Sequence, residues 1–519
     1  MTIASEITRI NGNIAAAYTA ASAKGATLPA TENSDNLATC ISSISGGGGG
    51  YSEVPSYSVS SGTASKRSLT LSGTEFASIT SIANNGLQYA FYGNTVNGNL
   101  NFTTLASVED HGLSNAFKNT SGTYNVSFPA LTTVDTYGFA YAFDGTSSTP
   151  SGLTGTVDLS GVTTIGNNGF NAAFRYSGVT SAVLPNVNAN NANQFSNAFY
   201  GCTSLTSVDL SRVTTIGSSS FDSTFHGCTS LTSVDLSKLE TISNSGLSSA
   251  FKSCASLTSV DLSAVTSVDN RGMMNVFQGC TNLATVDLSE LTTIGADGFD
   301  SAFRNCSGLT SVDLSSLTTI SGNNALSNAF NGCSNLTSFS VPALTTISGS
   351  GVFNSAFSYC TSLASVDLSA LTTIDASVLQ GAFSGCTSLA SVDFTALTTV
   401  KNNGLNTAFS GCTSLAIIRF PALATIESTS NYGAGGLMRA FENCTALTDV
   451  YFNALTTTSF TGGYLKQFGD MLIGTGTTVT HTLHFPSNLE STIQGLYGYP
   501  NFGGTSGYVT LAFDLPATS

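Results

Sequence analysis

Apolar and polar positions repeat along most of the chain with a period of 26 or 27 residues. In one repeat, Val234 and Leu236 alternate with Asp235, which predicts a short strand whose aspartate points outward. Leu239 and Ile242 follow as a second apolar pair, which predicts a bend or a second short strand. This half of each repeat is therefore predicted to be extended.

The other half of each repeat predicts a short helix. Phe221, Phe225 and Cys228 are spaced i, i+4 and i+7, as on one face of a helix. Turns such as Asn244-Ser245-Gly246 contain the residue types that start helices. One coil cannot bury its apolar face alone, whereas stacked coils bury a continuous core. The predicted fold class is therefore an α+β repeat solenoid of about 14 coils, each of about 26 residues.

The repeats resemble those of a known family. The segments AFKSCASLTSVDLSAVTSV (250–268) and AFSGCTSLASVDFTALTTV (382–400) resemble leucine-rich repeats of the BspA type, and such units recur in phase more than ten times between about residues 80 and 457. The resemblance implies a leucine-rich-repeat solenoid and a binding function, in a family found in bacterial and phage surface proteins. Repeats before Phe199 depart from the family pattern because they lack its cysteine.

Residues 1–45 are predicted to form a helical hairpin, with helices at 2–22 and 34–45. About 45 residues bury too little surface to be stable alone, so we expect this segment to self-associate or to dock on another protein. Residues 46–58 begin with five glycines and are predicted to be a flexible linker. The apolar positions of the two helices are Ile7, Ile10, Ile14, Leu37, Ile41 and Ile44. The hairpin resembles helical N-terminal segments of phage tail-associated and tail-fibre proteins.

The solenoid is predicted to span residues 59–457, with a small cap over its first coil. Residues 458–519 lose the repeat and are predicted to be a β-rich C-terminal cap. Caps are expected because the open ends of a strand ladder pair readily with other chains. The segments predicted within the two caps are strands at 57–59, 69–71, 480–485 and 508–513 and a helix at 491–497.

Composition argues against several classes of partner. Only 9% of residues are charged, the net charge is −15 and the pI is about 4.4, whereas a nucleic-acid-binding protein needs a basic surface. The same charge argues against electrostatic binding to a membrane. No run of 18 apolar residues occurs, so membrane insertion is not expected. The first residues lack a basic segment followed by an apolar core, so we expect no secretory signal peptide.

The cysteines and histidines are candidates for chemistry, but their spacing favours structural roles. Ten of the 11 cysteines occur once per coil, as expected for small buried side chains. Disulfides between neighbouring coils stay open as an alternative. Neither CxxC nor HExxH occurs, so no metal site is expected. We find no phosphate-binding loop and no GxSxG motif with an assignable His and Asp, so we expect no enzyme.

The outward strand position is the candidate ligand-facing site. It carries an aspartate in most coils, and neighbouring carboxylates about 4.8 Å apart repel each other by about 1 kcal/mol even in water. One interpretation is a solvated face; the other is an acidic ribbon that binds a cationic or hydroxyl-rich partner or Ca²⁺, which carboxylate oxygens suit. No EF-hand signature supports Ca²⁺, and no other cofactor is expected. The candidate residues are Asp209, Asp235, Asp261, Asp287, Asp313, Asp367, Asp393 and Arg419.

Together these features predict a non-enzymatic binding protein of a phage virion, of the tail-fibre or host-receptor-binding type. Its N-terminal helices would attach it to other virion proteins, as a homo-oligomer, and its solenoid would contact a protein or glycan on the host surface. Such a protein is made in the host cytoplasm and becomes part of the tail or of a surface appendage. The alternatives are a BspA-like adhesin on the bacterial cell surface and a glycan-degrading enzyme, since carboxylates about 5 Å apart are typical of retaining glycosidases.

Overall fold

The computed structural model describes residues 68–71, 76–185, 191–344, 346–427, 435–456, 471–472, 480–494 and 509–516. Several predicted segments lie outside these residues: the helical hairpin and linker, the strand at 57–59, residues 495–497 of the C-terminal helix, and the apolar positions Ile7, Ile10, Ile14, Leu37, Ile41 and Ile44. The chain divides into two compact units, Met1–Asp235 and Leu236–Ser519.

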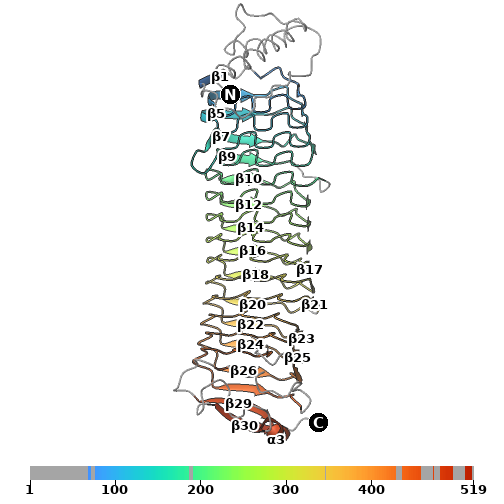
Figure 1. Cartoon of the computed structure of the whole chain (residues 1–519), viewed down its shortest axis with the longest axis vertical. Helices are drawn as coiled ribbons and strands as arrows, with labels where there is room; N and C mark the ends of the chain where they lie inside the picture. Colours follow the sequence, from blue (N-terminus) through green and yellow to red (C-terminus); the bar gives the residue numbers. More distant parts are fainter. Residues whose placement is uncertain are drawn as a thin grey trace, which may run out of the picture. The chain divides into compact units, whose positions relative to one another are not determined.

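In the first unit, successive coils add strands to a parallel sheet (Figure 1). Its strands are β1 (Ser68–Leu71), β3 (Thr95–Asn101), β5 (Ser121–Ser127), β7 (Ser151–Asp158), β9 (Ser177–Val183), β10 (Ser207–Asp209) and β12 (Ser233–Asp235). Two-residue strands form a second ladder: β2 (Ser81–Ile82), β4 (Ser107–Val108), β6 (Thr133–Val134) and β8 (Thr164–Ile165), with β11 (Thr215–Ile216) at the same place in its coil. Val208 pairs with Val234, so the repeat length sets the register, and β1 confirms the strand predicted at 69–71.

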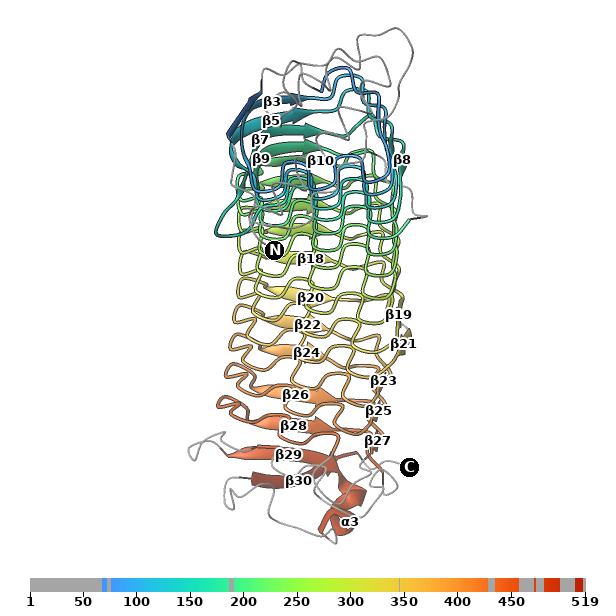
Figure 2. The same ribbon diagram turned by 45° about the horizontal axis from the view of Figure 1, so that its top comes forward.

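The second unit repeats this arrangement with shorter strands. The strands of its first series are β14 (Ser259–Asp261), β16 (Thr285–Asp287), β18 (Ser311–Asp313), β20 (Ser338–Ser340), β22 (Ser365–Asp367), β24 (Ser391–Asp393), β26 (Ile417–Phe420) and β28 (Asp449–Phe452). Those of the second series are β13 (Thr241–Ile242), β15 (Ser267–Val268), β17 (Thr293–Ile294), β19 (Thr319–Ser321), β21 (Thr346–Ser348), β23 (Thr373–Ile374), β25 (Thr399–Val400) and β27 (Thr425–Ile426). Figure 2 shows the two series on different sides of the coils. Val260, Val286 and Val312 pair in one row, as in-register stacking requires.

The second unit ends in a four-stranded parallel sheet in the order β26-β28-β29-β30. Strands β29 (His481–Pro486) and β30 (Val509–Leu515) confirm the strands predicted at 480–485 and 508–513. A 3-10 turn, η3 (Ser487–Leu489), leads into α3 (Glu490–Gln494), which overlaps the predicted helix.

The short helix predicted in each coil is wrong: the described coils contain consecutive β-turns there. Within residues 245–254, the even-numbered N–H groups donate to the carbonyl three residues earlier, and the odd-numbered N–H groups of 245–253 donate to the next coil. Phe251, for example, donates to the Val276 carbonyl at 2.9 Å. Positive φ angles of 54–61° recur every four residues, at Ser245, Ser249 and Ser253. A helix would direct all its N–H groups within the coil, whereas this turn ladder hydrogen-bonds the coils to one another.

The core of each unit consists of rows of equivalent side chains. Phe277, Phe303 and Phe330 are fully buried, and their ring centroids follow one another at 5.6 and 5.3 Å with nearly parallel planes. In the first unit, Phe117 and Phe143 stack in the same way at 5.2 Å. Identical rings stack because the period of the sequence equals the length of the coil, which brings the same position above itself.

The ten described cysteines are buried thiols, as the sequence predicts, and no disulfide joins them. The thiols lie against the preceding coil: the Sγ of Cys280, for example, donates to the Phe251 carbonyl at 3.0 Å. Burial raises the pKa of the Cys280 thiol to about 12. This thiol therefore stays neutral at physiological pH, and it gives the Phe251 carbonyl a second donor beside the Cys254 N–H.

Candidate binding surface

The predicted aspartate row lies at the ends of the longer strands. In the second unit, Asp261, Asp287 and Asp313 are exposed and pair in register as the last residues of their strands. Asp367 and Asp393 pair in the same way on β22 and β24. In each strand the residue before the aspartate packs inward, since side chains alternate across a strand.

In the first unit, Asp209 and Asp235 end β10 and β12 and are exposed. The structure therefore brings the candidate aspartates into rows within each unit, and their function as ligand-facing residues stays a prediction.

Each aspartate row also has a local structural function that the sequence analysis missed. The N–H and hydroxyl groups of Ser263 donate to Asp261 Oδ1 at 3.0 and 2.6 Å, and Ser211 contacts Asp209 in the same way. The same turn forms at Asp287, Asp313, Asp367 and Asp393, each of which accepts the N–H of the residue two positions later. Aspartate side chains commonly close such turns, so the Asp-x-Ser spacing is the signal that could have revealed them.

At three aspartates these turns stabilise the ionised carboxylate. Hydrogen bonds from Ser211, Ser263 and Ser369 hold the pKa of Asp209, Asp261 and Asp367 below the ordinary value. The ionised form of these three carboxylates is therefore favoured by the turns that they close.

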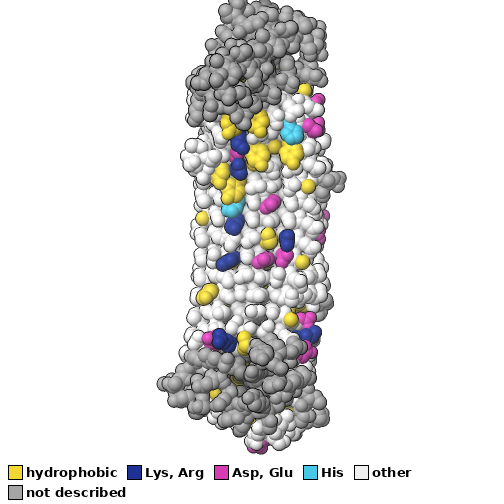
Figure 3. Space-filling view, in the orientation of Figure 1, with side chains coloured by type: hydrophobic (Ala, Val, Ile, Leu, Met, Phe, Trp, Pro, Cys, Tyr) yellow, Lys and Arg dark blue, Asp and Glu magenta, His cyan; other side chains and the backbone are white. Residues whose placement is uncertain are grey.

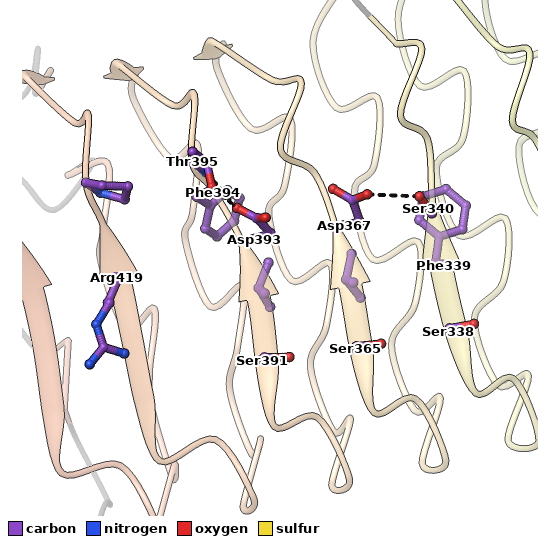
Figure 4. A pocket seen from close by; sticks show the side chains of 13 residues that line it. Ser338, Phe339, Ser340, Ser365, Asp367, Ser391, Asp393, Phe394, Thr395 and Arg419 are labelled. Carbon is purple, nitrogen blue, oxygen red and sulfur yellow. Dashed lines mark hydrogen bonds between the residues drawn. The ribbon is translucent and has the colours of Figure 1, made fainter.

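A groove of about 690 Å³ follows the outward face of β20, β22, β24 and β26 (Figure 4). Ser338, Ser365 and Ser391 form a row of hydroxyls along it, at the start of three consecutive strands. Asp367 and Asp393 form a parallel acidic row two residues further along the strands. The groove thus offers the same pair of polar groups in successive coils.

A second groove of about 470 Å³ lies over β14, β16 and β18. It is lined by the aspartate triplet Asp261, Asp287 and Asp313 and by Ser259 and Ser311 at the other ends of the strands. Both grooves belong to the strand face of the second unit, where exposed hydroxyls and carboxylates alternate with buried apolar residues.

Arg419 breaks the aspartate row with a positive charge. Its guanidinium lies 4.6 Å from the centre of the Tyr451 ring, and Tyr451 stacks on His484 at 4.1 Å with an interplanar angle of 5°. These three residues pair in register on β26, β28 and β29. Consecutive strands here place a cation and two aromatic rings where the preceding coils place carboxylates.

His484 lies between two carboxylates. Its Nε2 is 2.9 Å from Asp449 Oδ1 and its Nδ1 is 3.0 Å from Asp514. Burial alone would lower the pKa of His484, but the hydrogen bonds with Asp449 and Asp514 outweigh it and raise the pKa above the ordinary value. The bond to His484 in turn lowers the pKa of Asp449. The three groups therefore form a charge-assisted network.

Among the described residues, no group of three or more His, Cys, Asp or Glu side chains could hold a metal ion. The part of the chain that the structure describes contains no helix long and apolar enough to cross a bilayer.

The parallel coils, the buried Leu, Val and Phe rows and the exposed strand face define a leucine-rich-repeat solenoid, a class in which stacked repeats present extended surfaces. The family model for the BspA type leucine rich repeat region matches residues 114–224, 196–328, 300–403 and 354–465. The chain therefore belongs to the BspA-type leucine-rich-repeat family.

Solved structures of bacterial repeat proteins are similar in part. A leucine-rich repeat protein from Bacteroides ovatus has 20% identity and a TM-score of 0.37, with 69% of this chain and 91% of that chain covered. A leucine rich cell surface protein from Faecalibacterium prausnitzii has 21% identity and a TM-score of 0.28, with 61% and 86% covered. The T. pallidum leucine-rich repeat protein has 27% identity and a TM-score of 0.25, with 35% and 77% covered. No curated protein matches the sequence significantly.

Proposed function

We propose that this chain is a non-enzymatic binding protein whose outward strand face contacts an extended, hydroxyl-rich ligand such as a surface glycan. The observation that carries the proposal is the pair of rows along the larger groove, serines at the strand starts and aspartates at the strand ends. A repeating ligand can make the same weak contact in successive coils, and such contacts add when they are linked. Serine hydroxyls donate and accept hydrogen bonds and carboxylates accept them, so the two rows together can pair with sugar hydroxyls.

Two settings are compatible with this activity. Membership of the BspA-type family supports an adhesin on a bacterial cell surface. A phage virion component remains the alternative, with the N-terminal segment binding other virion proteins and forming a homo-oligomer while the solenoid contacts a host-surface protein or glycan. Immunogold labelling of intact bacteria and of purified phage particles distinguishes them, because label on the cells alone supports the adhesin and label on the particles supports the virion component.

The binding test uses the full chain against a panel of purified bacterial cell-wall polysaccharides. In the double variant S365Y/S391Y, two tyrosines fill the groove, and we expect polysaccharide binding to fall by more than tenfold. The matched control S388Y places the same side chain at an exposed turn residue outside the groove and should bind as the unmodified chain does. Equal binding by all three proteins would refute the assignment of the strand face.

The same incubation tests the non-enzymatic part of the proposal. A reducing-end assay on the polysaccharides should detect no new chain ends. New ends that vanish in D367N or D393N would instead establish the glycan-degrading alternative, because these neighbouring carboxylates are the pair that could act as acid and nucleophile.

A further inference from the structure

A second surface of the first unit has a different chemistry from the strand face. In each coil the residue directly after the core phenylalanine lies in the turn ladder. These residues stack from coil to coil: Arg175 and Tyr200 hold this position in neighbouring coils, and the N–H of Tyr176 donates to the Tyr200 carbonyl at 2.8 Å. In the first unit this position forms a continuous row of charged and aromatic residues. The row is Tyr92, Lys118, Asp144, Arg175, Tyr200 and His226.

The fold does not require these residue types. In three coils of the second unit the same position after the core phenylalanine is occupied by serine, at 358, 384 and 410, in coils with the same turns. The other coils of that unit carry Lys252, Gln278, Arg304, Asn331 and Glu442 there. A serine therefore suffices to build the coil. The first unit differs in that it combines aromatic and charged side chains at this position over six consecutive coils, which folding does not require.

A buried carboxylate fixes two cations in this row. The side chain of Asp144 is fully buried, and Arg175 binds it through two bonds, Nε to Oδ1 at 2.8 Å and Nη2 to Oδ2 at 3.0 Å. The Nζ of Lys118 is 3.2 Å from Oδ2. The side chains of Lys118 and Arg175 remain 24% and 32% exposed. Two cations on one carboxylate leave a net positive charge that is held in place at the surface.

Partly exposed aromatic rings surround these cations. Lys118 lies 4.6 Å from the centre of the Tyr141 ring, and Arg175 lies 5.7 and 5.8 Å from the rings of Tyr141 and Tyr176. The ring centroids of Tyr176 and Tyr200 are 5.4 Å apart, and those of Tyr200 and His226 are 4.6 Å apart. In Figure 3, hydrophobic, basic and His side chains gather in the upper half of the face shown, on a surface that is otherwise mostly white.

We propose that this basic-aromatic patch, formed by Lys118, Tyr141, Arg175, Tyr176, Tyr200 and His226, binds a saccharide that carries a carboxylate or a phosphate. Lys118 and Arg175 pair with the anionic group, since arginine held by a fixed partner is suited to carboxylate and phosphate oxygens. The tyrosine rings pack against the C–H faces of the sugar, and their hydroxyls bond to sugar hydroxyls.

Charge favours a single acidic sugar over a polyanion such as nucleic acid. The two cations and Asp144 together carry one net positive charge, while the whole chain carries −15. A polyanion would meet repulsion from the rest of the chain along its length. One acidic group meets only the local positive charge.

The test uses the full chain and isothermal titration at low salt. The probes are 3′-sialyllactose for the carboxylate, glucose 6-phosphate for the phosphate, lactose as the neutral sugar and inorganic phosphate as the anion without a sugar. We expect at least one acidic sugar to bind, and to bind at least fivefold more tightly than lactose and inorganic phosphate. The acidic sugar that binds identifies the anionic group. Binding of neither, or equal binding of lactose or of inorganic phosphate, would overturn the proposal.

Variants locate the site. K118Q and Y200S should each weaken binding at least fivefold, and Y200S introduces a residue that other coils carry at this position, so the coil should remain folded. The matched control Y359S removes an exposed tyrosine from a turn of the second unit and should leave binding unchanged. Unchanged melting temperatures confirm that the variants are folded. Unchanged binding in both K118Q and Y200S would refute the proposed site at the patch. The variant S365Y/S391Y should still bind the acidic sugar, which would show that this site is separate from the strand face.

Discussion

The early coils of the first unit and the coils of the second unit solve the same stacking problem differently. Strands β3 and β5 pair through seven residue pairs, whereas β16 and β18 pair through three. The coils with short strands carry a buried cysteine whose Sγ donates to a carbonyl of the preceding coil, as Cys306 does to Phe277 at 3.0 Å. In the early coil Thr120 occupies the position of the cysteine. Its hydroxyl donates to the Phe117 carbonyl within the same coil and lies 2.6 Å from the Tyr124 hydroxyl. Short strands thus rely more on the turn side, where the cysteine connects neighbouring coils.

The largest expected effect comes from replacing one stacked phenylalanine by alanine in each type of coil. F303A removes a fully buried ring between Phe277 and Phe330 and should lower the free energy of unfolding by about 3–5 kcal/mol. F117A should lose a similar amount, but the seven-pair ladder of β3 and β5 should keep their amides protected. Urea titration measures the free energy of unfolding, and hydrogen exchange measures the protection of the strand amides. Equal loss of exchange protection around both sites would contradict the contrast between long and short strands.

Removing one thiol should have a smaller effect. C306A deletes one of two donors to the Phe277 carbonyl, which still accepts the Cys280 N–H at 2.9 Å. The loss of this hydrogen bond together with the packing of the buried sulfur should cost about 1–2 kcal/mol. C306S keeps a donor and serves as the control, with less destabilisation than C306A. Urea titration measures the free energy of unfolding of both variants, and a C306S protein no more stable than C306A would contradict the role of the thiol as a hydrogen-bond donor.

The aspartate turns should contribute less again, because they are exposed. D261A removes the acceptor for two donors of Ser263 and should destabilise the coil by about 1 kcal/mol. The pKa of Asp261 is lowered in the folded chain, so its contribution is present above the ordinary value of 3.8 and is lost as the pH falls through the folded pKa. D261A should therefore differ from the unmodified chain at pH 7 and match it in strong acid, where the carboxylate is protonated. Thermal unfolding at several pH values measures this difference, and a constant gap would contradict the assignment.

The smallest effect concerns His484 in the terminal sheet. Its pKa is raised above the ordinary value of 6.5 in the folded chain, so its stabilising contribution is complete below pH 6.5 and is lost as the pH rises through the folded pKa. The amides of β29 should become less protected across that range, after correction for the intrinsic pH dependence of exchange. H484Q should remove the pH dependence, and an NMR titration of His484 that gave a pKa at or below 6.5 would refute the network.

Much of this fold could be predicted from the sequence because the period is regular. A strand at Val234 and a buried thiol at Cys306 follow from alternation and residue type at one position, repeated in every coil. The turn ladder could not be predicted, because β-turns that repeat every four residues bury the same positions as one face of a helix. The positive φ angles at residues such as Ser249 and the alternate N–H groups that donate to the next coil distinguish the turns from a helix.

The candidate sites were less accessible to sequence reasoning. Asp144 and Arg175 are 31 residues apart. They follow the core phenylalanines of neighbouring coils, but the sequence does not show that the carboxylate is buried and binds the arginine. Asp449, His484 and Asp514 are separated by 35 and 30 residues, and the last two lie beyond the repeats. The aspartate rows could be predicted as outward-facing positions, but their turns with Ser263 and its equivalents required the geometry of the strand ends.

In-register stacking is the central claim, since every row and both proposed surfaces depend on it. Asp287 and Asp313 are paired residues of neighbouring strands, and such neighbours lie about 4.8 Å apart, within reach of a disulfide. The double variant D287C/D313C should therefore cross-link under mild oxidation, joining tryptic peptide 272–304 to peptide 305–401 in mass spectra. D287C/D367C, whose positions lie on strands that do not pair, should give no such link. Cross-linking in the second variant but not in the first would contradict the account.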